Sequence, residues 1–444
     1  MGCPMTHKRY PRYKESGVAW IGNVPEQWEV KRLRHIATFT NSNVDKNAHD
    51  DQVVVSLCNY TDVYYNEFIT ADMPFMQATA SHSEIEQFSL KKGDVIITKD
   101  SEDPSDIGIP SLVIQEAPCV VCGYHLTMIR TADINTSRLL HRILQSHPTK
   151  AHFFVEAPGI TRYGLSQDAI GDLRFCLPPS GDRGAIADSL DRETSRIDAL
   201  IAKKTRFIEL LKEKRQALIT HTVTKGLDPD AKMKDSGVEW IGEIPTHWEV
   251  RRMATLFQEA IRPGEPSLPV LSISIHDGIT DDELAPEDRD RRVSQIEDRT
   301  KYKRVVPNDL AYNMMRAWQG AFGAVTVDGL VSPAYVVAEP TDAFRTGYIE
   351  HLLRTPMSIE EIRRHSRGIA DFRMRLYWDY FRDLKVCLPP LQEQDRILSR
   401  INHETARIDL LAGKTQLSID LLKERRSALI TATVTGQIDL RDAS

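Results

Sequence analysis

The residues best suited to recognition chemistry include a short polar and aromatic segment in the second half of the chain. Asn313, Arg316, Trp318 and Gln319 follow a short apolar run that predicts a strand. Amide and guanidinium groups are the side chains that read adenine and guanine edges, and arginine also clamps phosphate. The alternative is a structural role, with Trp318 in a core and Arg316 in a surface salt bridge. We expect this segment to contact nucleic acid.

Equivalent places in the first half carry different polar residues. One segment follows Thr98, and a later loop surrounds Arg162, which corresponds to a second-half loop around Arg373. Chemically different residues at matching places are expected of two readers of different base sequences. The predicted DNA contacts are Lys99, Arg162, Tyr163, Ser166, Asn313, Arg316, Gln319, Arg373 and Arg375.

Motifs for catalysis and for metal binding are weak in this sequence. The Gly-Lys-Thr at 413–415 has Ile408 where a phosphate-binding loop requires its first glycine. Cys119, Cys122 and His125 could suggest zinc, but a second ligand pair at a plausible spacing is missing. We interpret these cysteines as packing residues of an apolar strand. The sequence therefore predicts no catalytic residue, no metal site and no cofactor.

The elements that must position these residues come in two copies. A Trp block, Lys14 to Val30, returns as Lys234 to Val250 with eleven identities in seventeen positions. A helix block, Leu210 to Asp228, returns as Leu421 to Asp439 with thirteen identities in nineteen positions. The inserts between the blocks, roughly 31–175 and 251–386, share little sequence. The chain is therefore a duplicated frame that holds two divergent domains.

A heptad pattern precedes the end of each helix block. It runs from Ile186 to Lys225, and the second copy keeps the register from Ile401 to Thr433. Each helix would contain about 40 residues and extend about 60 Å, too long to be buried by its own insert alone. Gly226 and Gly436 stand where C-terminal caps belong. We expect the two helices to pair with each other.

The inserts predict mixed strands and helices, with short β-rich runs at 94–98, 119–122 and 335–338 and helices at 137–146 and 349–355. The expected fold is α+β, with two homologous mixed α/β domains joined by two long antiparallel helices in a pseudo-two-fold coiled coil. The predicted boundaries are 1–176 for the first domain, 177–228 for the first helix with its linker, 229–387 for the second domain and 388–444 for the second helix.

Composition favours a folded protein rather than a simple nucleic-acid binder. The 444 residues are 41% hydrophobic, and the net charge of -6 gives no overall basic excess. Six scattered cysteines fit a reducing compartment. No apolar run approaches the length of a membrane span, and the N-terminus lacks the apolar stretch of a secretory signal. We expect a cytoplasmic protein with no membrane contact.

The duplicated frame resembles the specificity subunit of type I restriction-modification systems. The residues that carry the resemblance are the Ser-Gly-Val-x-Trp-Ile-Gly motifs at 16–22 and 236–242, Leu-Pro-Pro-Leu-Gln-Glu-Gln at 388–394 and the two helix blocks. The segments 308–321 and 329–335 are similar to a recurring target-recognition sequence of that family. The resemblance covers essentially the whole chain.

The resemblance implies a non-catalytic subunit that reads a bipartite, asymmetric site in double-stranded DNA, one half per domain. Two modification subunits would dock on the frame and methylate adenine, and restriction subunits would join to translocate and cleave. Partner contacts are expected at Glu393 and Gln394. The first copy departs from this motif, because it reads Leu-Pro-Pro-Ser-Gly-Asp-Arg at 177–183, and Gly181 and Gly184 are expected to weaken the start of its helix. The alternatives are a coiled-coil scaffold without a DNA role and a self-contained methyltransferase or nuclease.

Overall fold

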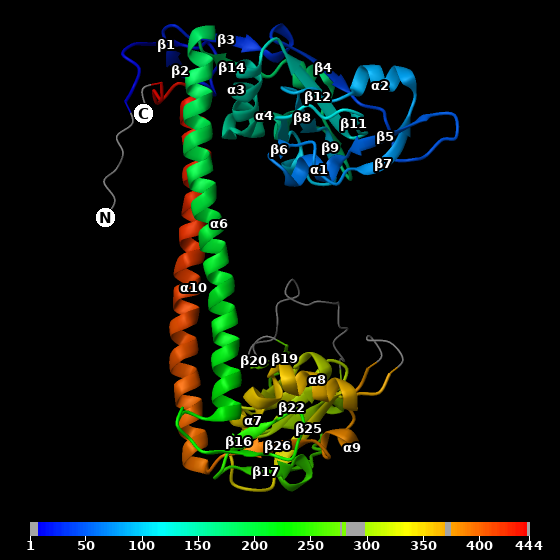
Figure 1. The fold of residues 1–444 in the computed structure, drawn as a ribbon, viewed down its shortest axis with the longest axis vertical. Coiled ribbons are helices and arrows are strands. Elements are labelled where there is room, and N and C mark those ends of the chain that lie inside the picture. Colours follow the sequence, from blue (N-terminus) through cyan, green and yellow to red (C-terminus); the bar gives the residue numbers. More distant parts are fainter. Residues whose placement is uncertain (1–7, 276–277, 281–297, 369–373, 442–444) are drawn as a thin grey trace. The chain divides into compact units, whose positions relative to one another are not determined.

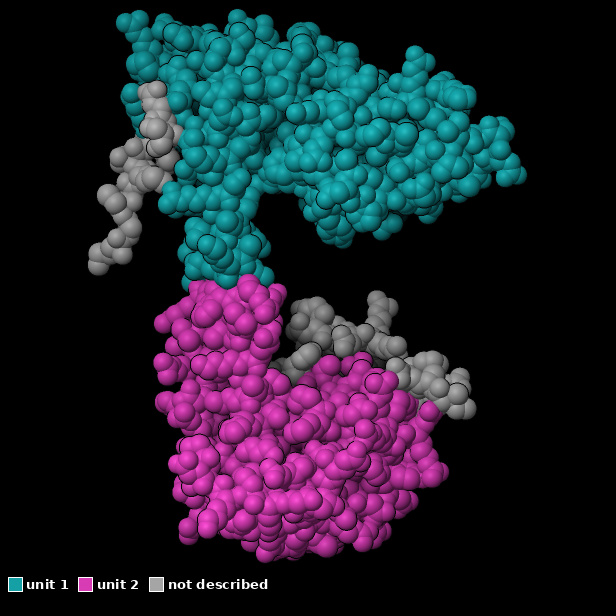
Figure 2. Space-filling view, viewed as in Figure 1, with its two compact units in different colours: residues 1–205, 417–444 teal, residues 206–416 magenta. Residues whose placement is uncertain are grey.

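The computed structural model describes residues 8–275, 278–280, 298–368 and 374–441. The chain divides into unit 1, residues 1–205 and 417–444, and unit 2, residues 206–416 (Figure 2). Each unit combines one Trp block, one insert and one helix block. The helix block that completes unit 1 comes from the end of the chain, so each unit is built from segments that are distant in sequence.

The insert of unit 1 is built on two sheets. The larger has the order β4 (Ala37–Asn41), β12 (Leu126–Thr131), β8 (Val95–Thr98), β10 (Pro110–Val113) and β6 (Phe68–Ile69). The smaller has the order β11 (Val120–Cys122), β5 (Val53–Cys58) and β7 (Met76–Ala80). All four residues of β8 are buried, as expected for a central strand with both faces covered.

Five helices complete this insert: α1 (Tyr60–Tyr65), α2 (His82–Phe88), α3 (Ile134–Gln145), α4 (His147–Glu156) and α5 (Gln167–Gly171). The helix α3 begins after Asp133, whose carboxylate accepts the Thr136 N–H. It packs against β8, β10 and β12, and α3, β8 and β12 are labelled in Figure 1. A short ribbon of β9 (Asp100–Ser101) and β13 (Tyr163–Gly164) lies beyond β8 in the chain.

The insert of unit 2 has a four-stranded antiparallel sheet, β18 (Phe257–Glu259), β25 (Tyr335–Pro340), β22 (Leu310–Asn313) and β23 (Phe322–Ala324). Two ribbons accompany it, β19 (Ser272–Ser274) with β20 (Gly278–Thr280) and β21 (Lys303–Val305) with β24 (Gly329–Val331). Its described helices are α7 (Thr346–Leu353), α8 (Pro356–His365) and α9 (Trp378–Phe381). The predicted strands and helices of both inserts are confirmed.

The Trp blocks fold alike in the two units. Each forms one ribbon, β1 (Tyr13–Glu15) with β2 (Asn23–Pro25) or β15 (Met233–Asp235) with β16 (Glu243–Pro245). Each then pairs with the end of its insert, β3 (Glu29–Arg32) with β14 (Arg174–Leu177) or β17 (Glu249–Arg252) with β26 (Lys385–Leu388). Trp28 and Trp248 are buried at equivalent places.

The two long helices are α6 (Ser180–Lys225) and α10 (Leu391–Val434). In unit 1 the first part of α6 packs with the last part of α10, where Leu190, Ile197 and Ile430 share a core. In unit 2 the opposite parts meet through Ile219 and Ile401. Both sets of contacts require antiparallel helices, so the predicted α+β fold with paired long helices is confirmed.

The helix α6 begins at Ser180, six residues before the predicted heptad start. Gly181 and Gly184 lie inside it, although glycine costs about 1 kcal/mol in a helix interior. Local contacts supply support, since the Arg183 guanidinium donates to the Pro178 carbonyl and to the Thr136 hydroxyl. The glycines therefore do not delay this helix.

The predicted glycine caps are confirmed. Gly226 and Gly436 follow the long helices at φ 82° and 73°, a conformation that side chains other than glycine rarely adopt. A side chain at Gly226 would approach Trp248, and one at Gly436 would collide with Pro25 beside Trp28. Each helix end is thus closed against the Trp block of its own unit.

Candidate nucleic-acid interface

Two strands in equivalent positions lead into the candidate loops. The strand β8 ends at Thr98, which pairs with Leu126 of β12. The strand β22 ends at Asn313, which pairs with Tyr335 of β25. The predicted correspondence of these strands is confirmed, and the loops that follow them occupy matching places in their sheets.

A buried aspartate precedes each of these strands. Asp94 and Asp309 are each 1% exposed, and each accepts a backbone N–H from three residues earlier in the chain. Arg130 of β12 binds the Asp94 carboxylate, whereas Arg262, which follows β18, binds Asp309. A buried carboxylate needs such a partner, so the two units meet the same requirement with arginines from different segments, one within β12 and one after β18.

In unit 1 the loop after β8 gathers basic side chains around one carboxylate. The Asp100 Oδ1 atom accepts from Arg162 Nη2 at 2.5 Å and lies 2.6 Å from His125 Nδ1. The Lys99 Nζ atom lies 3.9 Å from Asp100 Oδ2 and 5.0 Å from the centre of the Tyr124 ring. The Asp100 side chain is 13% exposed and the Arg162 side chain 54%. The carboxylate forms the base of the cluster, and the guanidinium reaches the surface.

The electrostatics of this cluster keep Asp100 ionised. Burial raises the pKa of Asp100, but hydrogen bonds from His125 and Arg162 outweigh burial and lower it overall. The same contact raises the pKa of Arg162. With Asp100 negative and Lys99 and Arg162 positive, the cluster retains positive charge at neutral pH.

Backbone hydrogen bonds hold the three segments of the cluster together. The Lys99 N–H donates to the His125 carbonyl, and the Leu165 N–H donates to the Lys99 carbonyl. Tyr163 is half-buried in β13 and packs against the core of unit 1. The Ser166 hydroxyl accepts the Ala169 N–H and caps α5. The structure thus brings Lys99 and Arg162 together, with Tyr163 beside them, and gives Ser166 a structural hydrogen bond.

Two exposed residues at this surface were not predicted as DNA contacts. Tyr124 is 48% exposed, and its ring lies 4.0 Å from that of His125. Ile160 is 93% exposed in a tight turn closed by a bridge between Gly159 and Tyr163. The isoleucine follows Gly159, where a side chain would collide with the Arg162 carbonyl. Gly159 is therefore the sequence signal that could have indicated this turn.

The Cys119, Cys122 and His125 pattern does not form a metal site. Cys122 is buried in β11, and burial raises the pKa of its thiol, whereas Cys119 is exposed. Across the described residues, no group of three or more His, Cys, Asp or Glu side chains is arranged to hold a metal ion. His125 instead contacts Asp100 and Arg162.

In unit 2 the loop after β22 is held by an amide and an indole. The Asn313 side chain is 9% exposed and accepts the Met315 N–H at 3.0 Å. The Trp318 Nε1–H donates to the Met315 carbonyl at 2.9 Å. The Arg363 guanidinium lies 5.7 Å from the centre of the Trp318 ring. The buried Asn313 side chain thus fixes the backbone of the loop through its hydrogen bond to Met315.

The same loop places Arg316 half-buried and Gln319 at the surface. A second arginine group of unit 2 lies where Arg367 and Arg375 form a backbone bridge. The Arg367 guanidinium stacks 4.5 Å from the centre of the Tyr380 ring, and Arg375 is exposed. Arg373 lies outside the described residues.

The expected partner residues Glu393 and Gln394 make internal contacts in unit 2. Gln394 is 1% exposed; its carbonyl oxygen accepts the Arg345 N–H, and its amide donates to the Pro389 carbonyl. Glu393 lies 2.7 Å from His247 Nε2, and its side chain is 12% exposed. A partner contact through Gln394 is not supported by this placement, because its amide is already used to join α10 to α7.

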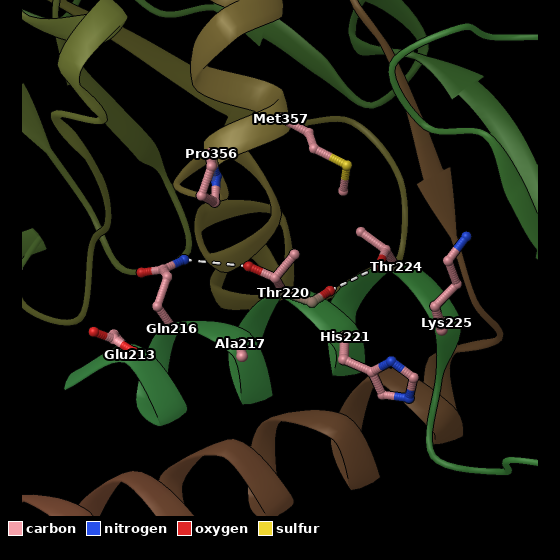
Figure 3. A pocket seen from close by; sticks show the side chains of 9 residues that line it. All are labelled: Glu213, Gln216, Ala217, Thr220, His221, Thr224, Lys225, Pro356 and Met357. Carbon is pink, nitrogen blue, oxygen red and sulfur yellow. Dashed lines mark hydrogen bonds between the residues drawn. The ribbon is translucent and has the colours of Figure 1, made fainter. Parts of the chain in front are cut away.

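A groove of about 620 Å³ lies in unit 2 between the end of α6 and the start of α8 (Figure 3). In this view Gln216 donates to Thr220, and Thr224 donates to the Thr220 carbonyl. The ionisable residues that line it are Glu213, His221 and Lys225. Within the part of the chain that the structure describes, the hydroxyls of Thr220 and Thr224 bond inside α6 and to no ionisable side chain, so the groove holds no nucleophile and base pair.

Two curated proteins align with the chain at 22% identity. One is a putative type I restriction enzyme MjaX specificity subunit from Methanocaldococcus jannaschii, aligned over 52% of each protein. The other is the type I restriction enzyme EcoBI specificity subunit from Escherichia coli, aligned over 63% of this chain and 61% of that protein. The chain thus spans about half to three-fifths of these relatives. No family model matches the sequence. The predicted resemblance is confirmed.

Two solved structures have a similar fold at 13% sequence identity. One comes from a study of complex assembly and conformational transition of the type I R-M system, with a TM-score of 0.64 over 93% of this chain and 98% of that one. The other is the HsdS subunit from Thermoanaerobacter tengcongensis, with a TM-score of 0.50 over 94% of this chain and 98% of that one. No helix within the described ranges is long and apolar enough to cross a membrane.

Proposed function

We propose that the chain is a non-catalytic DNA-recognition subunit of a type I restriction-modification complex. Each of its two domains reads one half of a bipartite, asymmetric site. One observation carries the proposal. The frame is repeated, but the polar clusters that follow the equivalent strands β8 and β22 differ between the two units. The resemblance to specificity subunits supports it.

DNA binding is compatible with the net charge of -6 because the relevant charge is local. Lys99 and Arg162 share a surface in unit 1, and Arg367 and Arg375 meet in unit 2. The neighbouring aromatic rings, Tyr124 among them, add apolar contact area. Such clusters bind phosphate and base edges without a basic excess over the whole chain.

The proposed partners are two modification subunits and, with them, restriction subunits, in the cytoplasm where the DNA lies. Leu210 and Leu421 occupy the same place in the two helix blocks, and they are 46% and 56% exposed. An exposed leucine contributes little to folding. A subunit that docks once on each copy would use the same apolar contact at both places. We therefore place docking on the exposed faces of the helix blocks rather than on Gln394.

The proposal is tested by exchanging one insert. Residues 31–175 are replaced by the equivalent insert of a relative, and the methylated sequence is read by methylome sequencing of cells that express the modification subunits. One half of the methylated motif should change while the other half and the gap stay constant. A change in both halves, or no methylation that depends on this chain, would contradict the proposal.

Docking is tested separately with the double substitution Leu210→Ser and Leu421→Ser. We expect the folded variant to lose modification subunits in native mass spectrometry. The control is Leu417→Ser, another leucine of α10 that is 61% exposed, but with Arg206 at the equivalent place of α6. Equal binding by the double variant and the control would exclude this docking surface.

A further inference from the structure

The Arg162 guanidinium is held along one edge and exposed along the other. Its Nε and Nη2 atoms donate to Asp100 Oδ1 at 3.1 and 2.5 Å, and Nη2 lies 2.9 Å from His125 Nδ1. Its Nη1 atom has no hydrogen-bond acceptor among the described residues. The side chain is 54% exposed. The outer edge of the guanidinium is therefore available to a ligand in a fixed orientation.

The support beneath Arg162 is part of the fold. Asp100 lies in β9, which pairs with β13 directly after Arg162 in the chain. His125 has a φ of 74°, which is uncommon for a residue with a side chain. Its carbonyl accepts the Lys99 N–H, which fixes this turn beside the ribbon. Backbone strain of this kind concentrates at functional sites.

Two uses of an exposed arginine on DNA can be distinguished here. A phosphate contact acts mainly through charge, and Asp100 cancels much of the charge of Arg162. A base contact acts through the direction of the N–H donors, which Asp100 fixes before DNA arrives. The arrangement weakens the first use and strengthens the second, because an arginine side chain otherwise loses about 2 kcal/mol of rotamer entropy when it is ordered.

We propose that Arg162 reads a guanine in the half-site of the first domain and that Asp100, with His125, is the positioning residue that orients it. The inference rests on the proposed function. In the major groove guanine presents two neighbouring acceptors, O6 and N7, which match two N–H donors of one guanidinium. Adenine offers a donor at the position of O6 and would be rejected.

The test uses the assembled methyltransferase complex and duplexes selected from a randomised pool. Wild-type complex should select one guanine whose replacement by 7-deazaguanine, which lacks the N7 acceptor, weakens binding about 5- to 150-fold. The Arg162→Ala complex should bind both duplexes equally and select no base at that position. The Arg162→Lys complex should behave like Arg162→Ala, because lysine keeps the charge but lacks the fork.

The positioning role of Asp100 is tested with Asp100→Asn. The matched control is Glu102→Gln. Glu102 is an exposed residue of the same loop, and its substitution by glutamine also removes one negative charge. Both variants should bind non-specific DNA more tightly, but only Asp100→Asn should lose most of the preference for guanine over 7-deazaguanine. Thermal melting establishes that each variant is folded, and Asp100→Glu, which keeps the charge, should retain part of the preference.

The outcomes separate the two proposals. If wild-type complex selects no sequence at all, the proposed function fails. If it selects a bipartite site and Arg162→Ala keeps every base preference while it weakens all duplexes equally, Arg162 binds phosphate and this inference is overturned. If Asp100→Asn and Glu102→Gln discriminate alike, Asp100 is not a positioning residue.

Discussion

The helix that follows the main sheet is joined to the long helices by different chemistry in the two units. In unit 1, Arg138 and Arg142 of α3 contact Asp191 of α6 at 2.6 and 2.7 Å. Arg142 is 1% exposed and also binds Glu67. The residues at the matching places of unit 2 are Gly347, His351 and Asn402.

Unit 2 uses a neutral connection at the matching place. The hydroxyl of Tyr348 in α7 donates to the Val223 carbonyl of α6 at 2.8 Å and lies 3.2 Å from the Cys387 carbonyl. The tyrosine is fully buried. A buried hydroxyl with such acceptors meets the hydrogen-bond requirement without charge.

The pairing of α6 with α10, in contrast, is the same in both units. Arg426 contacts Asp198 at 2.9 Å in unit 1, and Arg215 contacts Asp409 at 3.3 Å in unit 2. Both residues of the second pair are shifted by 211 positions from those of the first. Helix pairing is repeated because the heptads are repeated, whereas the attachment of each domain varies as long as its buried polar groups find partners.

The largest difference between the units should appear when the charged attachment is broken. Replacing Arg142 with Met removes the buried guanidinium, which we expect to destabilise unit 1 by about 1.5–3 kcal/mol. The loss stops short of an unpaired buried charge, because Asp191 keeps Arg138 and Glu67 keeps Arg426. Arg345→Met removes the exposed pair with Asp395 in unit 2 and should change little. Hydrogen exchange under mild denaturant reports each unit separately. Similar losses in both units would contradict the distinction.

A second comparison concerns the arginines that we propose as DNA contacts. Arg367 of unit 2 stacks on Tyr380, and its neighbour Arg375 contacts no carboxylate among the described residues. We expect Arg375→Ala to weaken binding to all duplexes about equally and to reduce the salt slope by about 1. Arg162→Ala should leave the slope nearly unchanged. DNA binding by both variants is measured across salt concentrations. Equal salt slopes for Arg375→Ala and Arg162→Ala would contradict the distinction between the two arginines.

Acid should destabilise unit 1 through His141. Burial lowers the pKa of His141 to about 3, so the folded state keeps it neutral while the unfolded state takes up a proton near pH 6.5. Stability is therefore lost as pH falls below about 6.5, by about 1 kcal/mol between pH 7 and 5.5. Burial lowers the pKa of His351 in unit 2 to about 4, and this histidine should contribute about as much in this window, because both folded pKa values lie well below 5.5.

Denaturation of His141→Gln at both pH values provides the check. The variant should lose the part of the pH dependence that the wild-type histidine supplies. If His141→Gln and the wild-type chain lose the same stability between pH 7 and 5.5, the histidine is not responsible.

The smallest expected difference lies at the caps between consecutive helices. Thr355 accepts the Ser358 N–H at the start of α8, whereas Ser146 makes no such cap bond at the start of α4. Thr355→Ala should cost about 1 kcal/mol and Ser146→Ala less. Chemical denaturation of the two variants measures this, and a larger loss for Ser146→Ala would show that its bond to the Ile143 carbonyl matters more than the cap.

Expectations that rest on local or periodic patterns were confirmed. The heptads place Leu190 and Ile197 in the core of unit 1, because an apolar stripe of this period must be buried on one side. The strand ending at Thr98 and the glycine caps follow from equally local rules. The partner contact expected at Gln394 remains a prediction, and nothing in the sequence indicated that this side chain is buried and accepts the N–H of Arg345, 49 positions away.

The sequence by itself determined the duplication, the paired long helices and the loops where the two domains differ, because repeats and apolar periodicity are properties of short segments. Only the tertiary structure decided which side chains meet in those loops. Asp100 and Arg162 are 62 positions apart, and the sequence places His125 beside Cys119 and Cys122 rather than beside either of them. Their contact exists because β9 pairs with β13, and strand pairing between distant segments depends on the packed sheet rather than on either segment alone.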